Sequence, residues 1–187
     1  MKPSAEFDIV VYGASGFTGQ LVAEYLVAHH GNSDLKWAMA GRSLDKLASV
    51  RDAFGAPRDL PLIKADASDP ASLKAMVGRT ASVLTTVGPY QLYGSDLVAA
   101  CAASGTDYLD LCGEPVWMRQ MIDAHQAEAQ KSGARIVFSC GYDSLPFELG
   151  VFFLQEAAKK QFGSTVARVK GRVRKMKGTF SGGTAAS

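Results

Sequence analysis

Short apolar runs alternate with stretches of helical periodicity along the first 140 residues of the chain. The runs are rich in β-branched and small apolar side chains, which favours buried strands. Strands that alternate with helices form a parallel sheet, joined by right-handed crossovers and covered by helices on both faces. The pattern therefore predicts an α/β chain with a doubly wound parallel sheet. The predicted strands cover residues 9–12, 36–41, 62–65, 81–87, 107–111 and 134–139.

The stretches between these runs carry apolar residues three and four positions apart, which is the spacing of a helix with one buried face. The first of them follows residue 19 and places Leu21, Val22, Tyr25 and Leu26 on a face that we expect to pack inward. The other predicted helices cover residues 43–54, a segment that begins at 70, and residues 95–103, 117–131 and 145–162.

The pattern changes after residue 163, where residues 165–174 alternate between apolar and basic positions. A period of two predicts a strand with one buried face, as in antiparallel sheets, and no partner strand precedes it. Residues 182–187 indicate the start of a helix. We therefore expect a first domain over 1–162, and over 163–187 the first strand and helix start of an incomplete second α/β domain.

The predicted strand at 9–12 runs into a turn with glycine at every third position, Gly13, Gly16 and Gly19. Glycine lets a phosphate approach the backbone, and the N–H groups and dipole of a helix N-terminus attract the anion. A dinucleotide pyrophosphate is the expected ligand of this strand–turn–helix context. The alternative is an ordinary turn without a ligand, for which three glycines would cost needless backbone entropy. The candidate residues are Gly13, Ala14, Ser15, Gly16, Phe17, Thr18 and Gly19.

The second predicted strand is followed by Arg42 and Ser43. An NAD site places Asp or Glu here, to accept hydrogen bonds from the ribose 2′-hydroxyl, and this sequence has neither. Arg42 offers a planar, charged fork that suits a 2′-phosphate, and Ser43 adds its hydroxyl or N–H. Ser43 can also cap the helix that follows. The sequence therefore favours NADP(H) over NAD(H).

Composition narrows the class of protein. The 187 residues are 47% hydrophobic and 20% charged, as in soluble globular chains, and their formal net charge is +2. This charge is too small to indicate nucleic acid or a membrane surface. The most apolar stretch, 145–154, carries Glu148 and is far shorter than the ~20 residues of a spanning helix. We expect no nucleic-acid partner and no stable membrane insertion.

Cysteine usage points to a compartment. Cys101, Cys112 and Cys140 are an odd number and form no Cys-x-x-Cys pair. This pattern predicts neither a disulfide framework nor a zinc site, and it indicates a reducing environment. We therefore expect no metal site and a cytoplasmic location.

Several motifs occur together in a fixed order. They are GASGFTG at 13–19, AGRS at 40–43, VGPY at 87–90, YLDLCGE at 108–114, GYDSLP at 141–146 and GGT at 182–184. In this order the chain resembles the saccharopine dehydrogenase-like oxidoreductase family, and within it the bacterial and mycobacterial branch that includes trans-acting enoyl reductases. The resemblance implies an N-terminal NADP-binding Rossmann domain, residues 1–162 here, followed by a C-terminal α/β domain that extends beyond residue 187.

The resemblance implies roles for the residues at the adenosine end of the cofactor. It places the 13–19 loop at the pyrophosphate, and Arg42 and Ser43 at the 2′-phosphate. It places Asp66 at the adenine, where a carboxylate can accept a hydrogen bond from the exocyclic amine. The alternative for Asp66 is to cap the helix that begins near Asp69.

At the other end of the cofactor, the resemblance places Gly88, Pro89 and Tyr90 beside the nicotinamide ribose, with packing of Tyr90 in the core as the alternative. Four titratable residues on the same rim are candidates for proton transfer or for ordering turns, so the catalytic residues stay unassigned. One of them could instead cap the helix at 145–162. The four are Asp110, Glu114, Tyr142 and Asp143, and the last is the candidate cap.

The resemblance implies an NADP(H)-dependent oxidoreductase that transfers a hydride to or from a small-molecule or acyl-chain substrate, such as an imine or an enoyl group. It also implies a homo-oligomer formed through the missing domain. The alternative is a non-catalytic module that binds or senses NADP(H), because a fold does not fix a function. A short-chain dehydrogenase is not expected, since no tyrosine is followed by lysine four positions later.

Overall fold

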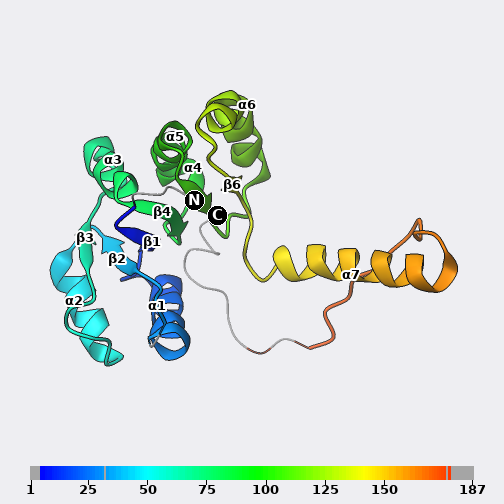
Figure 1. Cartoon of the computed structure of the whole chain (residues 1–187), viewed down its shortest axis with the longest axis horizontal. Helices are drawn as coiled ribbons and strands as arrows, with labels where there is room; N and C mark the ends of the chain where they lie inside the picture. Colours follow the sequence, from blue (N-terminus) through cyan, green and yellow to red (C-terminus); the bar gives the residue numbers. More distant parts are fainter. Residues whose placement is uncertain (1–4, 32, 176, 178–187) are drawn as a thin grey trace.

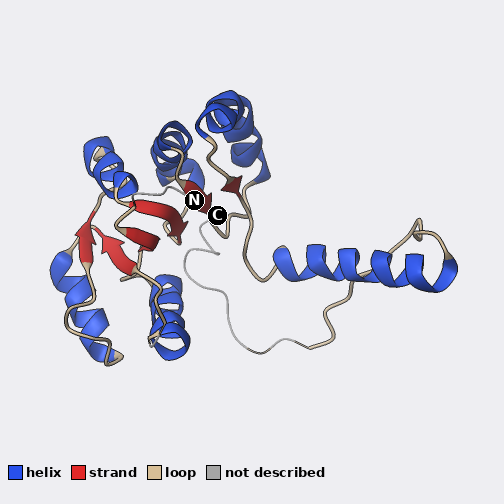
Figure 2. Ribbon diagram, in the orientation of Figure 1, coloured by secondary structure: helices blue, strands red, loops and turns tan. Residues whose placement is uncertain are grey.

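The computed structural model describes residues 5–31, 33–175 and 177. Its centre is one six-stranded sheet in which every neighbouring pair of strands is parallel. The strands, drawn as red arrows in Figure 2, lie in the order β3-β2-β1-β4-β5-β6, which is the Rossmann order and confirms the predicted fold class. The strands are β1 (Phe7–Tyr12), β2 (Trp37–Gly41), β3 (Leu62–Lys64), β4 (Thr80–Thr85), β5 (Asp107–Leu109) and β6 (Ile136–Val137).

Helices cover both faces of this sheet (Figure 1). On one face α1 and α2 pack against β1 and β2, and on the other α3, α5 and α6 pack against the central strands. The short α4 lies between the predicted strand at 81–87 and the predicted helix at 95–103, and it was not predicted. The helices are α1 (Phe17–His30), α2 (Leu44–Ala53), α3 (Pro70–Gly78), α4 (Tyr90–Tyr93), α5 (Ser95–Ser104), α6 (Pro115–Ser132) and α7 (Leu145–Phe162).

The central strand β1 has a buried side chain on each face of the sheet. Val11 packs with Leu47 of α2, whereas Val10 and Tyr12 pack in the opposite cluster with Leu73 of α3. All of these side chains are at most 1% exposed. Burial on both faces explains why this strand is a continuous apolar run rather than an alternating one.

The inward face of α1 differs from the predicted one. Leu21 and Tyr25 are 52% and 56% exposed, and the buried positions are Gly19, Ala23 and Leu26. A glycine and an alanine on the inner face let the helix lie close to the sheet, and this close approach fixes the rotation of the helix. Of the four residues predicted to face inward, Leu26 is buried and Val22 is partly buried against the same core cluster.

The predicted strand at 165–174 is absent from the structure. This segment has no regular secondary structure, because a strand needs a neighbour and none lies beside it. Instead, the side-chain amide of Gln155 in α7 donates to the carbonyl of Val166 and accepts from its N–H, both at 2.9 Å. The predicted helix start at 182–187 lies outside the described residues.

Helix α7 has the predicted bounds and extends away from the sheet (Figure 1). It ends at Gly163, which adopts a left-handed conformation with φ of 76°. Of its side chains only Ala158 is buried, and Phe152 and Phe153 are 65% and 71% exposed. None of the helices in the described ranges combines the length and the apolar character needed to cross a membrane.

Candidate functional site

A cavity of about 330 Å³ lies beside the carboxyl ends of β1, β2, β3 and β4. In the order β3-β2-β1-β4, the chain reverses its direction of winding between β1 and β4, and open α/β sheets bind their ligands at this crevice. The cavity brings together residues from all four strand ends. Six of the predicted site residues line it: Gly13, Ser15, Gly16, Arg42, Asp66 and Gly88.

The glycine loop forms the central part of the cavity. Gly13 has a φ of +87°, and a Cβ there would lie 2.8 Å from both Thr86 Oγ1 and Val87 Cγ2. Gly16 precedes α1 and donates its N–H to the carbonyl of Gly13 at 2.9 Å. No side chain caps α1, so the first N–H groups of this helix are available to an anion.

Other residues of the loop have different positions. Ala14 is fully buried in the core, and Gly19 lies so close to the turn that a Cβ there would be 2.1 Å from the carbonyl oxygen of Gly13. Phe17 is 70% exposed at the start of α1. The cavity lining includes none of the residues Ala14, Phe17, Thr18 and Gly19. The third glycine therefore serves the packing of the helix on the turn.

The ends of β2 and β3 provide the charges of the cavity. Arg42 is exposed, and within the described part of the chain it forms no hydrogen bond or ion pair, so its guanidinium is available. Ser43 lies outside the cavity lining and caps α2, because its Oγ accepts from the N–H of Lys46 at 3.3 Å. A cation without a protein partner at a ligand-binding edge suits an anionic group such as a phosphate.

Asp66 lines the same cavity as Arg42. Its carboxylate accepts hydrogen bonds from the N–H and hydroxyl of Ser68, at 3.0 and 2.8 Å, and these bonds lower the pKa of Asp66. The nearby charges of Arg42 and Lys64 lower it further. Asp69 caps α3 by accepting from the N–H groups of residues 71 and 72, so Asp66 is not the cap.

At the end of β4, Gly88 lines the cavity, but Pro89 and Tyr90 do not. Tyr90 is 4% exposed, and its ring packs on Trp117 with a centroid distance of 5.8 Å. Its hydroxyl donates to the carbonyl of Thr85 at 3.3 Å, and burial raises its pKa. The structure thus places the Tyr90 side chain in the core, as the packing alternative supposed.

Several residues that line the cavity were not predicted from the sequence. Thr86 and Val87 were counted as strand, although β4 ends at Thr85 and both residues reach the cavity. Tyr12 is the last residue of β1; burial and the charge of Asp66 raise its pKa to about 12. These three residues lie at or just after the carboxyl end of a strand, and this position is the signal that could have identified them. The remaining missed lining residues are Gly41, Ala67, Ser68 and Tyr93.

The four rim candidates for proton transfer do not line this cavity. Asp110 is 2% exposed and Glu114 is half-buried, and both carboxylates accept hydrogen bonds from backbone N–H groups. Tyr142 is 63% exposed. Asp143 does not cap α7, whose N-cap residue is Ser144 and has no side-chain cap, so the capping alternative is wrong.

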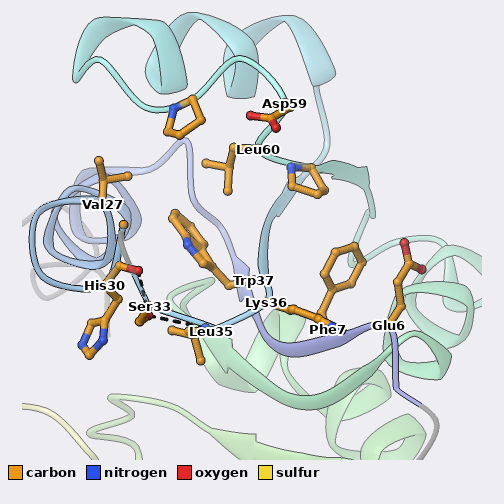
Figure 3. A pocket seen from close by; sticks show the side chains of 13 residues that line it. Glu6, Phe7, Val27, His30, Ser33, Leu35, Lys36, Trp37, Asp59 and Leu60 are labelled. Carbon is orange, nitrogen blue, oxygen red and sulfur yellow. Dashed lines mark hydrogen bonds between the residues drawn. The ribbon is translucent and has the colours of Figure 1, made fainter.

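The described residues contain no group of His, Cys, Asp and Glu that could hold a metal. A second hollow, of about 310 Å³, lies at the opposite edge of the sheet (Figure 3). It is bordered by Phe7 and Trp37 at the amino ends of β1 and β2 and by Leu60. Parallel sheets bind ligands at the carboxyl ends of their strands, so the cavity at the glycine loop is the candidate ligand site.

Comparison with known proteins gives matches along most of the chain. Residues 9–137 match the family described as saccharopine dehydrogenase NADP binding domain. A relative from Mycobacterium tuberculosis (strain ATCC 25618 / H37Rv) is 51% identical over 183 residues, which are 97% of this chain and 43% of the relative. The trans-acting enoyl reductase of Mycobacterium leprae (strain TN) is 53% identical over 150 residues, 80% of this chain and 35% of that protein. The chain thus spans less than half the length of these curated relatives.

Solved structures share the fold at low sequence identity. Apo saccharopine dehydrogenase (L-Glu forming) from Saccharomyces cerevisiae has a TM-score of 0.64 and 21% identity, and covers 82% of this chain and 32% of its own. Triphenylmethane reductase from Citrobacter sp., complexed with NADP(H), has a TM-score of 0.52 and 19% identity, over 84% of this chain and 55% of its own. These likenesses show the Rossmann fold alone.

Proposed function

Because the chain belongs to the saccharopine dehydrogenase NADP-binding domain family, we propose that it is the cofactor-binding part of an NADP(H)-dependent oxidoreductase. Family membership confirms the predicted resemblance and the predicted cofactor, NADP. The observation that carries the proposal is the cavity at the crevice between β1 and β4, which joins a glycine cradle to an unpaired arginine. The cradle fits the cofactor, since Gly13 and Gly16 line it without side chains and α1, which follows, has no side-chain cap on its first N–H groups.

The proposed placement of the cofactor follows the strand order. The pyrophosphate lies at the 13–19 loop above β1, with the adenosine half over β2 and β3 and the nicotinamide half over β4. Arg42 binds the 2′-phosphate, assisted by the backbone N–H of Ser43 because the hydroxyl of Ser43 caps α2. Asp66 binds the adenine, and Gly88 and Pro89 pass beside the nicotinamide ribose. NADPH supplies the hydride when it is bound, and the role of these residues is to bind and orient the cofactor.

For the substrate we propose a small molecule or acyl chain with a reducible double bond, such as an imine or an enoyl group. The names of the relatives support this class, because one is a trans-acting enoyl reductase. The test measures NADPH oxidation by a protein of the relatives' full length, against panels of imines and enoyl thioesters. If the full-length protein binds NADPH but oxidises it with none of the compounds in either panel, the protein would instead be a binding or sensing module.

Arg42→Ala is expected to remove the preference for NADPH over NADH. The unmodified chain should bind NADPH at least about tenfold more tightly, about 1.4 kcal/mol, because only NADPH offers the 2′-phosphate to this guanidinium. Fluorescence titration with both cofactors measures the ratio. Arg58→Ala is a matched control, since Arg58 is exposed and lies outside the cavity lining. A preference that survives Arg42→Ala would contradict the assignment.

We propose that residues 163–187 begin a second domain that the longer relatives share. The exposed apolar side chains of α7 support this, because a helix that is apolar on most sides is normally buried. We also propose that the protein is cytoplasmic, from its cysteine usage, and that it forms a homo-oligomer through the C-terminal domain. In that domain the apolar side chains of α7 would be covered.

The isolated chain is expected to self-associate through α7. Phe152 and Phe153 are adjacent on this helix and are 65% and 71% exposed, and burying them against another copy removes apolar surface from water. Replacing both with serine should shift the species seen by light scattering towards the monomer. Serine at Lys159 and Lys160, exposed on the same helix, is the control. A chain that is monomeric before any substitution would contradict this prediction.

A further inference from the structure

The loop of residues 110–114 lies between two other loops of the functional rim. It follows β5, and β5 lies between β4 and β6 in the sheet. The loop after β4 carries Thr86, Val87 and Gly88 into the cavity, and the loop after β6 leads to α7. Contacts of the central loop can therefore fix both neighbours.

Glu114 connects the central loop to the loop after β4. Its Oε1 accepts from the N–H of Tyr90 and its Oε2 from the N–H of Gln91, both at 2.8 Å. These are the first two residues of α4, which also carries the cavity-lining Tyr93. Hydrogen bonds to a carboxylate are stronger than those between neutral groups. One side chain thus fixes the segment just after Gly88.

Asp110 makes the matching connection to the loop after β6. Its Oδ1 accepts from the N–H of Ser139 at 2.8 Å and from that of Cys112 at 3.0 Å, and its Oδ2 accepts from the hydroxyl of Tyr108 at 2.8 Å. Ser139 has a φ of 60°, which non-glycine residues rarely adopt. Its hydroxyl also donates to the carbonyl of Cys112 at 2.7 Å. Ser139 is therefore held to the central loop from two sides.

We propose that Glu114 and Asp110 are positioning residues, which make the 110–114 loop a two-sided clamp on the loops after β4 and β6. The inference rests on the proposed function, because the clamp orders the side of the cavity assigned to the nicotinamide half of NADPH. Both carboxyl oxygens of each residue already accept hydrogen bonds within the protein. With these hydrogen bonds, the two side chains order the backbone of the neighbouring loops and do not transfer protons.

The test compares two ligands in Glu114→Gln. Glutamine keeps the shape but turns an NH₂ group towards one of the two N–H donors, so one hydrogen bond is replaced by a repulsion. NADPH should bind roughly tenfold more weakly, as expected for losing a hydrogen bond to a charged group. The ligand 2′,5′-ADP occupies only the adenosine half, and its affinity should change less than about twofold, within normal context dependence.

Glu6→Gln is the matched control, because Glu6 also accepts two hydrogen bonds, from Arg79 Nε and Nη2, but lies at the opposite edge of the sheet. It should leave both affinities unchanged. Equal weakening of NADPH and 2′,5′-ADP in Glu114→Gln would indicate a general structural role and overturn the clamp. Unchanged NADPH affinity would overturn it as well.

Amide hydrogen exchange in the ligand-free chain tests the clamp separately from cofactor binding. The amides of Tyr90, Gln91 and Ser139 should be protected in the unmodified chain. In Glu114→Gln the first two should exchange faster, while Ser139 stays protected because Asp110 holds it. Unprotected amides in the unmodified chain would overturn the clamp even if the variant fails to fold. Failure of the unmodified chain to bind NADPH, with these amides protected, would contradict the proposed function and not the clamp.

Discussion

Gly16→Val is expected to weaken NADPH binding by at least about 100-fold, which corresponds to about 2.7 kcal/mol. Gly16 lines the cavity immediately before α1, where the phosphates are proposed to meet the free N–H groups of the helix. A valine side chain would occupy this approach. Its backbone, with φ of −82° and ψ of 168°, is an extended conformation that valine adopts readily. A Cβ at this position would lie 3.2 Å from the carbonyl oxygen of Gly13, which requires only a small shift of the turn, so the loss should come mainly from ligand exclusion.

Calorimetric titration with NADPH measures this loss, after circular dichroism has verified the fold. Gly78→Val is the control, because Gly78 is exposed in α3 and a Cβ there meets nothing within 4 Å. Gly13→Val is also expected to abolish binding but is a less direct test. Its positive φ and its contacts with Thr86 and Val87 would strain the fold as well. Retained NADPH affinity in folded Gly16→Val would refute the pyrophosphate assignment.

Gly19→Ala is expected to lower the free energy of unfolding by about 3 kcal/mol, at the upper end of what overpacking costs. The added Cβ would lie 2.1 Å from the carbonyl oxygen of Gly13 and 2.8 Å from the Cα of Ala14. Both are backbone atoms, so α1 must move away from the sheet. The higher helix propensity of alanine offsets only about 1 kcal/mol of this cost.

Thermal unfolding checks the prediction for Gly19. A loss of about 3 kcal/mol lowers the Tm of a domain of this size by roughly 6–12 °C. Gly78→Ala, at an open position of another helix, should leave the Tm unchanged or raise it slightly. An unchanged Tm in Gly19→Ala would mean that α1 is not packed as closely on the turn as described.

The alternation of strands and helices was predictable because the central strands are buried on both faces and the helices that cover the sheet are buried on one. The same pattern gave the position of the ligand edge, since Gly13, Arg42 and Asp66 each follow a predicted strand. These residues meet in one cavity because parallel strands end at a common edge. The motif and its context were therefore sufficient to predict that these three residues line one cavity.

The remaining features depend on contacts between distant segments. Leu21 and Tyr25 have helical spacing, but the rotation of α1 is set by the close approach at Gly19, which spacing does not encode. Tyr90 follows the end of a strand, as the cavity-lining residues do. Its ring nevertheless packs in the core against Trp117, which is distant in sequence. Glu114 looked like a candidate acid because its N–H partners are 23 and 24 positions away.

The side-chain amide of Gln155 has the same donor and acceptor as a peptide group, and it offers both to Val166 in the way a neighbouring strand would. It thus acts as a one-residue substitute for a strand. Two hydrogen bonds contribute only about 1–3 kcal/mol in water, so a true strand that pairs along the whole of 165–174 would outcompete it. We therefore expect Gln155 to release Val166 wherever a neighbouring strand pairs with this segment.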